Sequence, residues 1–140
     1  MKPNRRKSVL EKIARKNLVE SAKLKTQLVE QQNHLTDIQD LIVRVQDLQE
    51  NAQESKFDSP TQLRSARWYS LKLSEQFTIL NNRVEFIEAE IDNLRSISRT
   101  QSFKNGKLDK LIVEAKNMIR LERDRKQDKK TNFAHSVSSR

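Results

Sequence analysis

The sequence contains no cysteine, one glycine and two prolines among its 140 residues. The absence of cysteine excludes a disulfide scaffold, a thiolate metal site and a cysteine nucleophile. With one glycine, no Gly-rich phosphate-binding loop can be built. No apolar run approaches the roughly 18 residues of a membrane span, and residues 1–25 lack the apolar block of a signal peptide. These absences predict a cytoplasmic protein without membrane insertion.

Charge is abundant and unevenly placed along the chain. Charged and hydrophobic residues each make up 34% of the sequence, which is typical of long helices rather than of a globular core. Residues 1–25 carry nine Lys and Arg against two Glu, and residues 104–140 carry eleven against five acidic residues. Residues 26–103 carry eight against twelve. Both ends of the chain are therefore basic, and its middle is acidic.

A first long helix is predicted over residues 8–54. Ser8 and Glu11 have the spacing of a capping box, in which each side chain binds the backbone amide of the other residue. Beyond them, residues three and four apart form a seam, the stripe of one helix that packs against another. The sustained spacing predicts a coiled-coil helix. Its seam residues are Leu10, Ala14, Asn17, Ser21, Leu24, Leu28, Gln31, Leu35, Ile38, Ile42, Val45, Gln49 and Ala52.

A turn is predicted over residues 55–59, and a second helix over residues 60–131. Pro60 suits the first helical position, Ser59 can cap the helix, and Gln62 can complete a second capping box. The seam of this helix contains Leu63, Ala66, Ser70, Leu73, Phe77, Leu80, Val84, Ile87, Ile91 and Leu94, and the same phase returns at Leu108, Ile112, Ala115 and Ile119.

Two long seams joined by a short turn can bury each other only by folding back. The predicted fold is all-α: a single domain over residues 1–140, forming an elongated antiparallel two-helix coiled-coil hairpin with a longer second helix and a flexible tail over 132–140. Asn105 and Gly106 would normally indicate a turn. The preserved seam phase favours one continuous helix, and a third helix from about residue 107 is the alternative.

The second helix is expected to extend beyond the first. A symmetric turn near residue 57 places Leu10 opposite about residue 104, where the first helix runs out. The overhang would then expose an apolar stripe with no partner in the monomer, which implies an interaction partner. The stripe contains Leu108, Leu111, Ile112, Ala115, Met118 and Ile119.

No catalytic set is recognisable. The two histidines are far apart in the sequence, and carboxylates such as those of Asp37, Asp40 and Asp47 are spread along a solvent face. A protein that is not an enzyme, with no catalytic residue, cofactor or metal, is expected. The basic run LERDRKQDKK is interrupted by acidic residues and lacks a nucleic-acid-binding signature. Two alternative functions stay open. One is a coiled-coil scaffold that associates with itself, and the other, which is less favoured, is a coiled coil that binds nucleic acid.

Three features together resemble the FliJ family of flagellar type III export proteins and their injectisome counterparts of the YscO type. They are the two-helix layout over nearly the whole chain, the pair Arg67 and Trp68 soon after the turn, and the closing stretch ERDRKQDKKTNFAHS. The resemblance implies a protein-transport accessory factor like the central stalk of a rotary ATPase. It also implies a place on the cytoplasmic side of a membrane export apparatus, with peripheral association.

The resemblance also implies partners and sites. The terminal half would enter the hexameric ring of the export ATPase, and the region toward the turn would contact the export gate membrane protein. Export chaperones are further expected partners, and the chain itself is expected to be a monomer or weak homo-oligomer. The expected ATPase-binding residues are Leu111, Met118, Ile119, Arg120, Arg123, Arg125, Lys126 and Lys130. The expected export-gate-binding residues are Val45, Leu48, Ala52, Trp68, Phe77 and Leu80.

Overall fold

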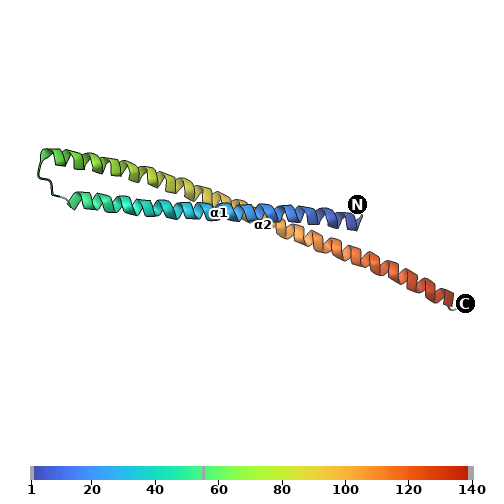
Figure 1. The fold of residues 1–140 in the computed structure, drawn as a ribbon. Helices are drawn as coiled ribbons and strands as arrows, with labels where there is room; N and C mark the ends of the chain where they lie inside the picture. The colour runs from blue at the N-terminus through green and yellow to red at the C-terminus, as the bar shows by residue number, and fades with distance from the viewer. Residues whose placement is uncertain (1, 55, 139–140) are drawn as a thin grey trace. The chain divides into compact units, whose positions relative to one another are not determined.

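The computed structural model describes residues 2–54 and 56–138, which form two long helices. Helix α1 spans Pro3–Glu54 and helix α2 spans Pro60–Ser138 (Figure 1). No strand occurs among the described residues. The all-α class and the position of the link between the helices are as predicted.

Close contacts divide the chain into two units, each built from parts of both helices. Unit 1 consists of Met1–Lys23 and Ser98–Arg140, and unit 2 consists of Leu24–Ile97. Unit 2 contains the link, and in it the end of α1 and the start of α2 lie side by side in opposite directions (Figure 1, cyan and green). Unit 2 therefore has the antiparallel helical arrangement that was predicted for the chain.

The start of α2 follows from a local hydrogen-bonded cap. Ser59 Oγ accepts from the backbone amide of Gln62 at 3.2 Å, and Gln62 Oε1 accepts from the amide of Asp58 at 2.8 Å. Pro60 occupies the first helical position, where its missing amide hydrogen costs nothing. The cap predicted at Ser59 is confirmed, although Gln62 binds the amide one residue before the expected one.

The predicted start of α1 is wrong. The helix begins at Pro3 rather than Ser8, and Ser8 lies inside it. Pro3 is well suited to a first helical turn because its φ angle is already helical and it has no amide to satisfy. Glu11 lies near Lys7 instead of capping Ser8, with its carboxylate 3.8 Å from the Lys7 ammonium. Helix α1 is therefore longer than predicted by more than one turn, and it includes most of the basic residues at the start of the chain.

Apolar side chains facing each other across the two helices hold unit 2 together. The core cluster contains Ile38 of α1 and Leu80, Ile87 and Ile91 of α2, each at most 8% exposed. Since the three α2 positions are four, seven or eleven residues apart, they share one helix face. The predicted seam is therefore the buried stripe of unit 2. Partly buried seam residues complete the cluster: Leu28, Leu35, Ile42, Val45 and Val84.

The helices of unit 2 pair further along α2 than a symmetric turn predicts. Gln49 Nε2 donates to Ser74 Oγ at 3.1 Å, whereas a symmetric turn places Gln49 opposite about residue 65. Phe57 of the link lines a groove together with Ala52. The start of α2 lies beyond the end of α1 (Figure 1). Leu63, in the first turns of α2, is consequently 37% exposed instead of packed.

The buried stripe of unit 1 contains polar as well as apolar side chains. Leu108 and Ala115 of α2 are buried. Asn105 Nδ2 donates to Ser21 Oγ at 3.2 Å, whereas the buried Asn105 Oδ1 has no hydrogen-bond partner among the described residues. A polar pair of this kind is satisfied only in the register that brings its members together. This hydrogen bond therefore helps to fix how the start of α1 pairs with α2.

Helix α2 also extends further than predicted. The tail expected over 132–140 is helical as far as Ser138, and residues 139–140 lie outside the described residues. No proline or glycine follows Gly106, so nothing in this stretch forces the helix to end. Thr131 Oγ1 donates to the Gln127 carbonyl at 2.9 Å just before this extension.

Gly106 lies inside α2, so the expectation of one continuous helix is confirmed and a third helix is excluded. Its φ angle is not positive, and a Cβ atom there would meet nothing within 4 Å. Replacing Gly106 by Ala is therefore expected to raise the free energy of unfolding by about 0.5–1 kcal/mol, because alanine loses less backbone entropy in a helix. Thermal unfolding followed by circular dichroism measures this change, and a lower midpoint would contradict it.

Candidate interaction surfaces

The end of α2 in unit 1 is a fully exposed helix, called the basic end below and defined as Arg120 to Ala134. Every residue in it is exposed. None of these fifteen residues is buried or half-buried against α1. The basic residues are Arg120, Arg123, Arg125, Lys126, Lys129 and Lys130.

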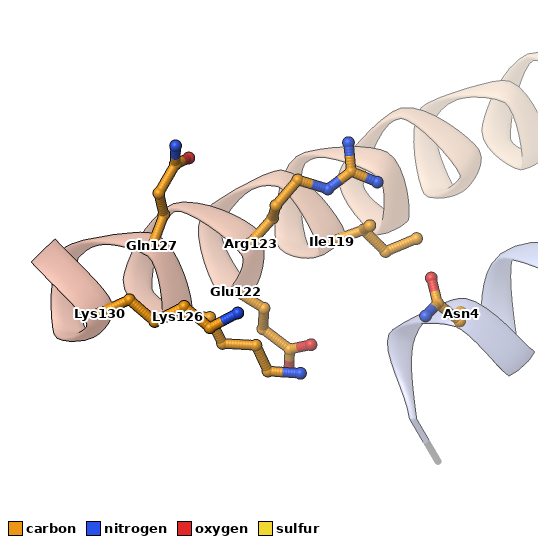
Figure 2. Close-up of a pocket in the computed structure, with 7 residues that line it drawn as sticks. All are labelled: Asn4, Ile119, Glu122, Arg123, Lys126, Gln127 and Lys130. Atoms are coloured by element: carbon orange, nitrogen blue, oxygen red, sulfur yellow. The ribbon is translucent and has the colours of Figure 1, made fainter.

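A shallow pocket of about 540 Å³ lies where the basic end begins (Figure 2). Asn4 in the first turn of α1 forms one end of it, opposite Ile119 of α2. The remaining lining residues recur at three- and four-residue spacing and therefore share one face of α2. The pocket has Ile119 as the one apolar residue of its lining, and the rest of the wall is polar and mostly basic. Its wall consists of Glu122, Arg123, Lys126, Gln127 and Lys130.

The apolar stripe expected on an overhang is mostly covered, so that expectation is corrected. Leu108 is 8% exposed and Ala115 is 2% exposed, while Ile112 and Ile119 are half-buried. The cause is the longer α1 and the shifted pairing, which bring Asn4 to Ile119 instead of ending α1 near residue 104. The uncovered part of α2 begins after Ile119 and is mainly charged.

The expected ATPase-binding residues are therefore of two kinds. The five basic ones, with Arg120 first and Lys130 last, are all exposed in the basic end. Leu111 and Met118 are exposed by 37% and 53%, whereas Ile119 is half-buried beside Asn4. The charged residues thus form a continuous accessible segment, and the apolar ones are accessible only at its border.

A second surface lies beside the link in unit 2. A groove of about 290 Å³, called the link groove below, is formed by both helices and the link. Phe57 and Tyr69 are each 40% exposed there, and Leu48 is 44% exposed. Exposed aromatic and aliphatic side chains in a concave setting are typical of protein-binding surfaces. The groove is lined by Leu48, Asn51, Ala52, Phe57, Ala66 and Tyr69.

The expected gate-binding residues are only partly brought together at this surface. Leu48 and Ala52 line the link groove. Leu80 is 7% exposed in the core cluster, and Val45 packs against that cluster, so both face the fold rather than a partner. Phe77 is likewise half-buried in the seam.

Trp68 is the most exposed of the expected gate-binding residues, at 63%. It lines a neighbouring hollow with Arg64, Ser65 and Tyr69, and Lys72 Nζ lies 5.8 Å from its ring centroid. An exposed indole partly occupied by a cation remains available to a partner on its other side.

Phe57 is a site residue that sequence reasoning missed. Phe57 stands alone in the polar stretch ESKFDSPTQ, and an aromatic residue in such a link was the available signal. Its position depends on the course of the link, which seam spacing does not determine.

Two kinds of structural feature are absent from the described residues. Among residues 2–54 and 56–138, no group of three His, Asp or Glu side chains is placed to hold a metal ion. In the same residues, neither helix has a segment long and apolar enough to cross a membrane.

Comparison with known proteins gives no relative, since no family model, curated protein or solved structure matches this chain.

The two surfaces of the chain differ in character: the basic end is charged and convex, whereas the link groove is apolar and concave.

Proposed function

We propose that this chain is an accessory factor of type III protein export, acting like the central stalk of a rotary ATPase. In this proposal the basic end enters the hexameric ring of the export ATPase, and the link groove with Trp68 meets the export gate. The observation that carries the proposal is the exposed helical extension beyond Ile119, which concentrates positive charge on a narrow helix. A single helix is slender enough to enter a ring.

Charge and apolar contact have different roles at the basic end. Positive side chains attract an acidic lumen at a distance and speed association, an effect that salt screens. Leu121 and Phe133 are 57% and 72% exposed and provide contact area that salt does not screen. Met118 extends this apolar area toward the covered part of α2. Binding to the ring should therefore weaken with salt without vanishing.

Reversing three charges tests the proposed ring contact. The triple variant Arg123→Glu, Lys126→Glu and Lys130→Glu is expected to weaken binding to the export ATPase about tenfold or more at low ionic strength, mainly through slower association. All three side chains are exposed, so helicity should be retained. Surface plasmon resonance at two salt concentrations measures both the loss and its screening.

Two control variants test whether the loss of ATPase binding is specific to the basic end. Lys12→Glu, Arg15→Glu and Lys16→Glu make the same change in net charge at exposed positions of α1 in the same unit, and should weaken ATPase binding much less. Trp68→Ala should reduce binding to the export gate and leave ATPase binding intact. Equal losses in both triple variants would show attraction by net charge alone and count against a defined ring contact. Loss of tight, salt-sensitive nucleic-acid binding in the first variant would favour that alternative instead.

A further inference from the structure

Unit 2 has a third hollow, away from the link, that no expected partner explains. This groove of about 600 Å³, called the middle groove below, has buried Ile38 and Ile87 at its base. Ile79 and Phe86 on its α2 wall are 44% and 74% exposed. The other lining residues are Gln31, His34, Asn82 and Arg83. A phenylalanine this exposed beside an apolar floor indicates a surface that another molecule covers.

The shape of the middle groove suits a helix. Ile79 and Phe86 are seven residues apart on α2, and Gln31 and Ile38 are seven apart on α1. Two helical turns advance about 10.5 Å, so the walls present the repeat that a third helix can match. The occupant should carry exposed apolar residues seven apart on one face.

The net charges of the two units indicate which helix can bind in the middle groove. Unit 2 has 8 Lys and Arg against 12 Asp and Glu, and the exposed Glu30 and Asp37 border the α1 wall of the groove. Unit 1 has 20 Lys and Arg against 7 Asp and Glu. The units therefore carry net charges of −4 and +13. Unit 1 of one copy is thus complementary in charge to unit 2 of another.

A matching helix face exists in unit 1. Leu111 and Met118 are exposed, seven residues apart on α2, and lie on the face that also carries Lys107. Glu114 lies between them on this face, just as Arg83 lies between Ile79 and Phe86 on the groove wall. The two faces therefore have the same apolar spacing, and each has one charge between its apolar residues, of opposite sign on the two faces.

We propose that the middle groove binds a second copy of this chain, with Leu111 and Met118 of one copy packed against Ile79 and Phe86 of the other. Glu114 pairs with Arg83 across this contact, and Lys107 faces the acidic border formed by Glu30 and Asp37. The contact needs only copies of this chain and is independent of any export partner. It covers Leu111 and Met118, so a chain bound in this way has less of its apolar border free for other partners.

Sedimentation velocity of the full chain over a range of concentrations and salt tests the proposal. The mass should rise toward that of a dimer with concentration, and less so at high salt. Phe86→Ser and Met118→Ser should each weaken association about tenfold or more, because each removes a central apolar contact. Val113→Ser is the matched control: Val113 is 55% exposed, close to the 53% of Met118, but lies on another face of α2. It should leave association unchanged.

A charge exchange makes the proposal specific. Arg83→Glu and Glu114→Arg should each weaken association, and the double variant should restore it, since the pair is re-formed with reversed polarity. Both residues are exposed, so circular dichroism should show unchanged helicity. A chain that stays monomeric at every concentration and salt would overturn the proposal. So would association that Phe86→Ser leaves intact, or a double variant that is no better than the single ones.

Discussion

Replacing Ile87 by alanine is expected to destabilise unit 2 by about 2–5 kcal/mol, a large share of the stability of a small helical hairpin. Ile87 is 7% exposed and belongs to the core cluster with Ile38, Leu80 and Ile91. The substitution removes buried apolar area and leaves a cavity between two helices, which can collapse only in part. A hairpin with a narrow core has few other contacts to compensate.

Urea unfolding followed by circular dichroism measures this loss as a lower transition midpoint. Val43→Ala is the matched control, because Val43 is 54% exposed on the same unit and its truncation should change stability by no more than about 0.5 kcal/mol. A midpoint for Ile87→Ala equal to that of the control would contradict the helix pairing of unit 2.

Seam spacing predicted the buried stripe because it is a local property of the sequence. Ile38, Leu80 and Ile87 are three of the core residues expected from spacing alone, and all are buried. The cap at Ser59 was equally local, since it depends on residues within one helical turn. Burial and capping could therefore be predicted without knowledge of any tertiary contact.

The register between the helices was not accessible in the same way. The register depends on the path of the link between the helices. In the structure, Phe57 of the link lines a groove formed with both helices. Successive seam residues are nearly equivalent, so a pairing shifted along α2 still buries apolar residues on both helices. The hydrogen bond between Asn105 and Ser21 selects one register, but a sequence alone does not show which polar residues meet.

Because the register was predicted wrongly, the expected border between the covered and the exposed part of α2 was also wrong. The exposure of Arg123 and Lys126 was predictable, because consecutive charged residues leave a helix no apolar face to bury. The burial of Leu108 and Ala115 was not, because it requires α1 to begin at Pro3 and to pair further along α2. Charge could thus be assigned from sequence, whereas the boundary between covered and free helix could not.

That boundary determines where the chain can be shortened without unfolding it. Removing residues 121–140 keeps Ile119, the last half-buried seam residue, and deletes a segment whose residues up to Ala134 are all exposed. Removing residues 109–140 instead deletes Ala115 and Ile119, which cover the start of α1 in unit 1. The shorter deletion should leave the unfolding midpoint nearly unchanged, whereas the longer one should lower it.

The deletion of residues 121–140 is therefore expected to separate folding from the proposed export function. It removes Arg123, Lys126 and Lys130 together with the exposed apolar residues Leu121 and Phe133. Stimulation of the export ATPase and promotion of its ring should fall to the level seen without this chain, because both the long-range attraction and the contact area are lost. ATPase assays with ring formation followed by light scattering measure both effects, and circular dichroism checks the fold. A shortened chain that still promotes ring assembly like the full chain would exclude the stalk proposal, since no part of the basic end beyond Arg120 would remain to enter the ring.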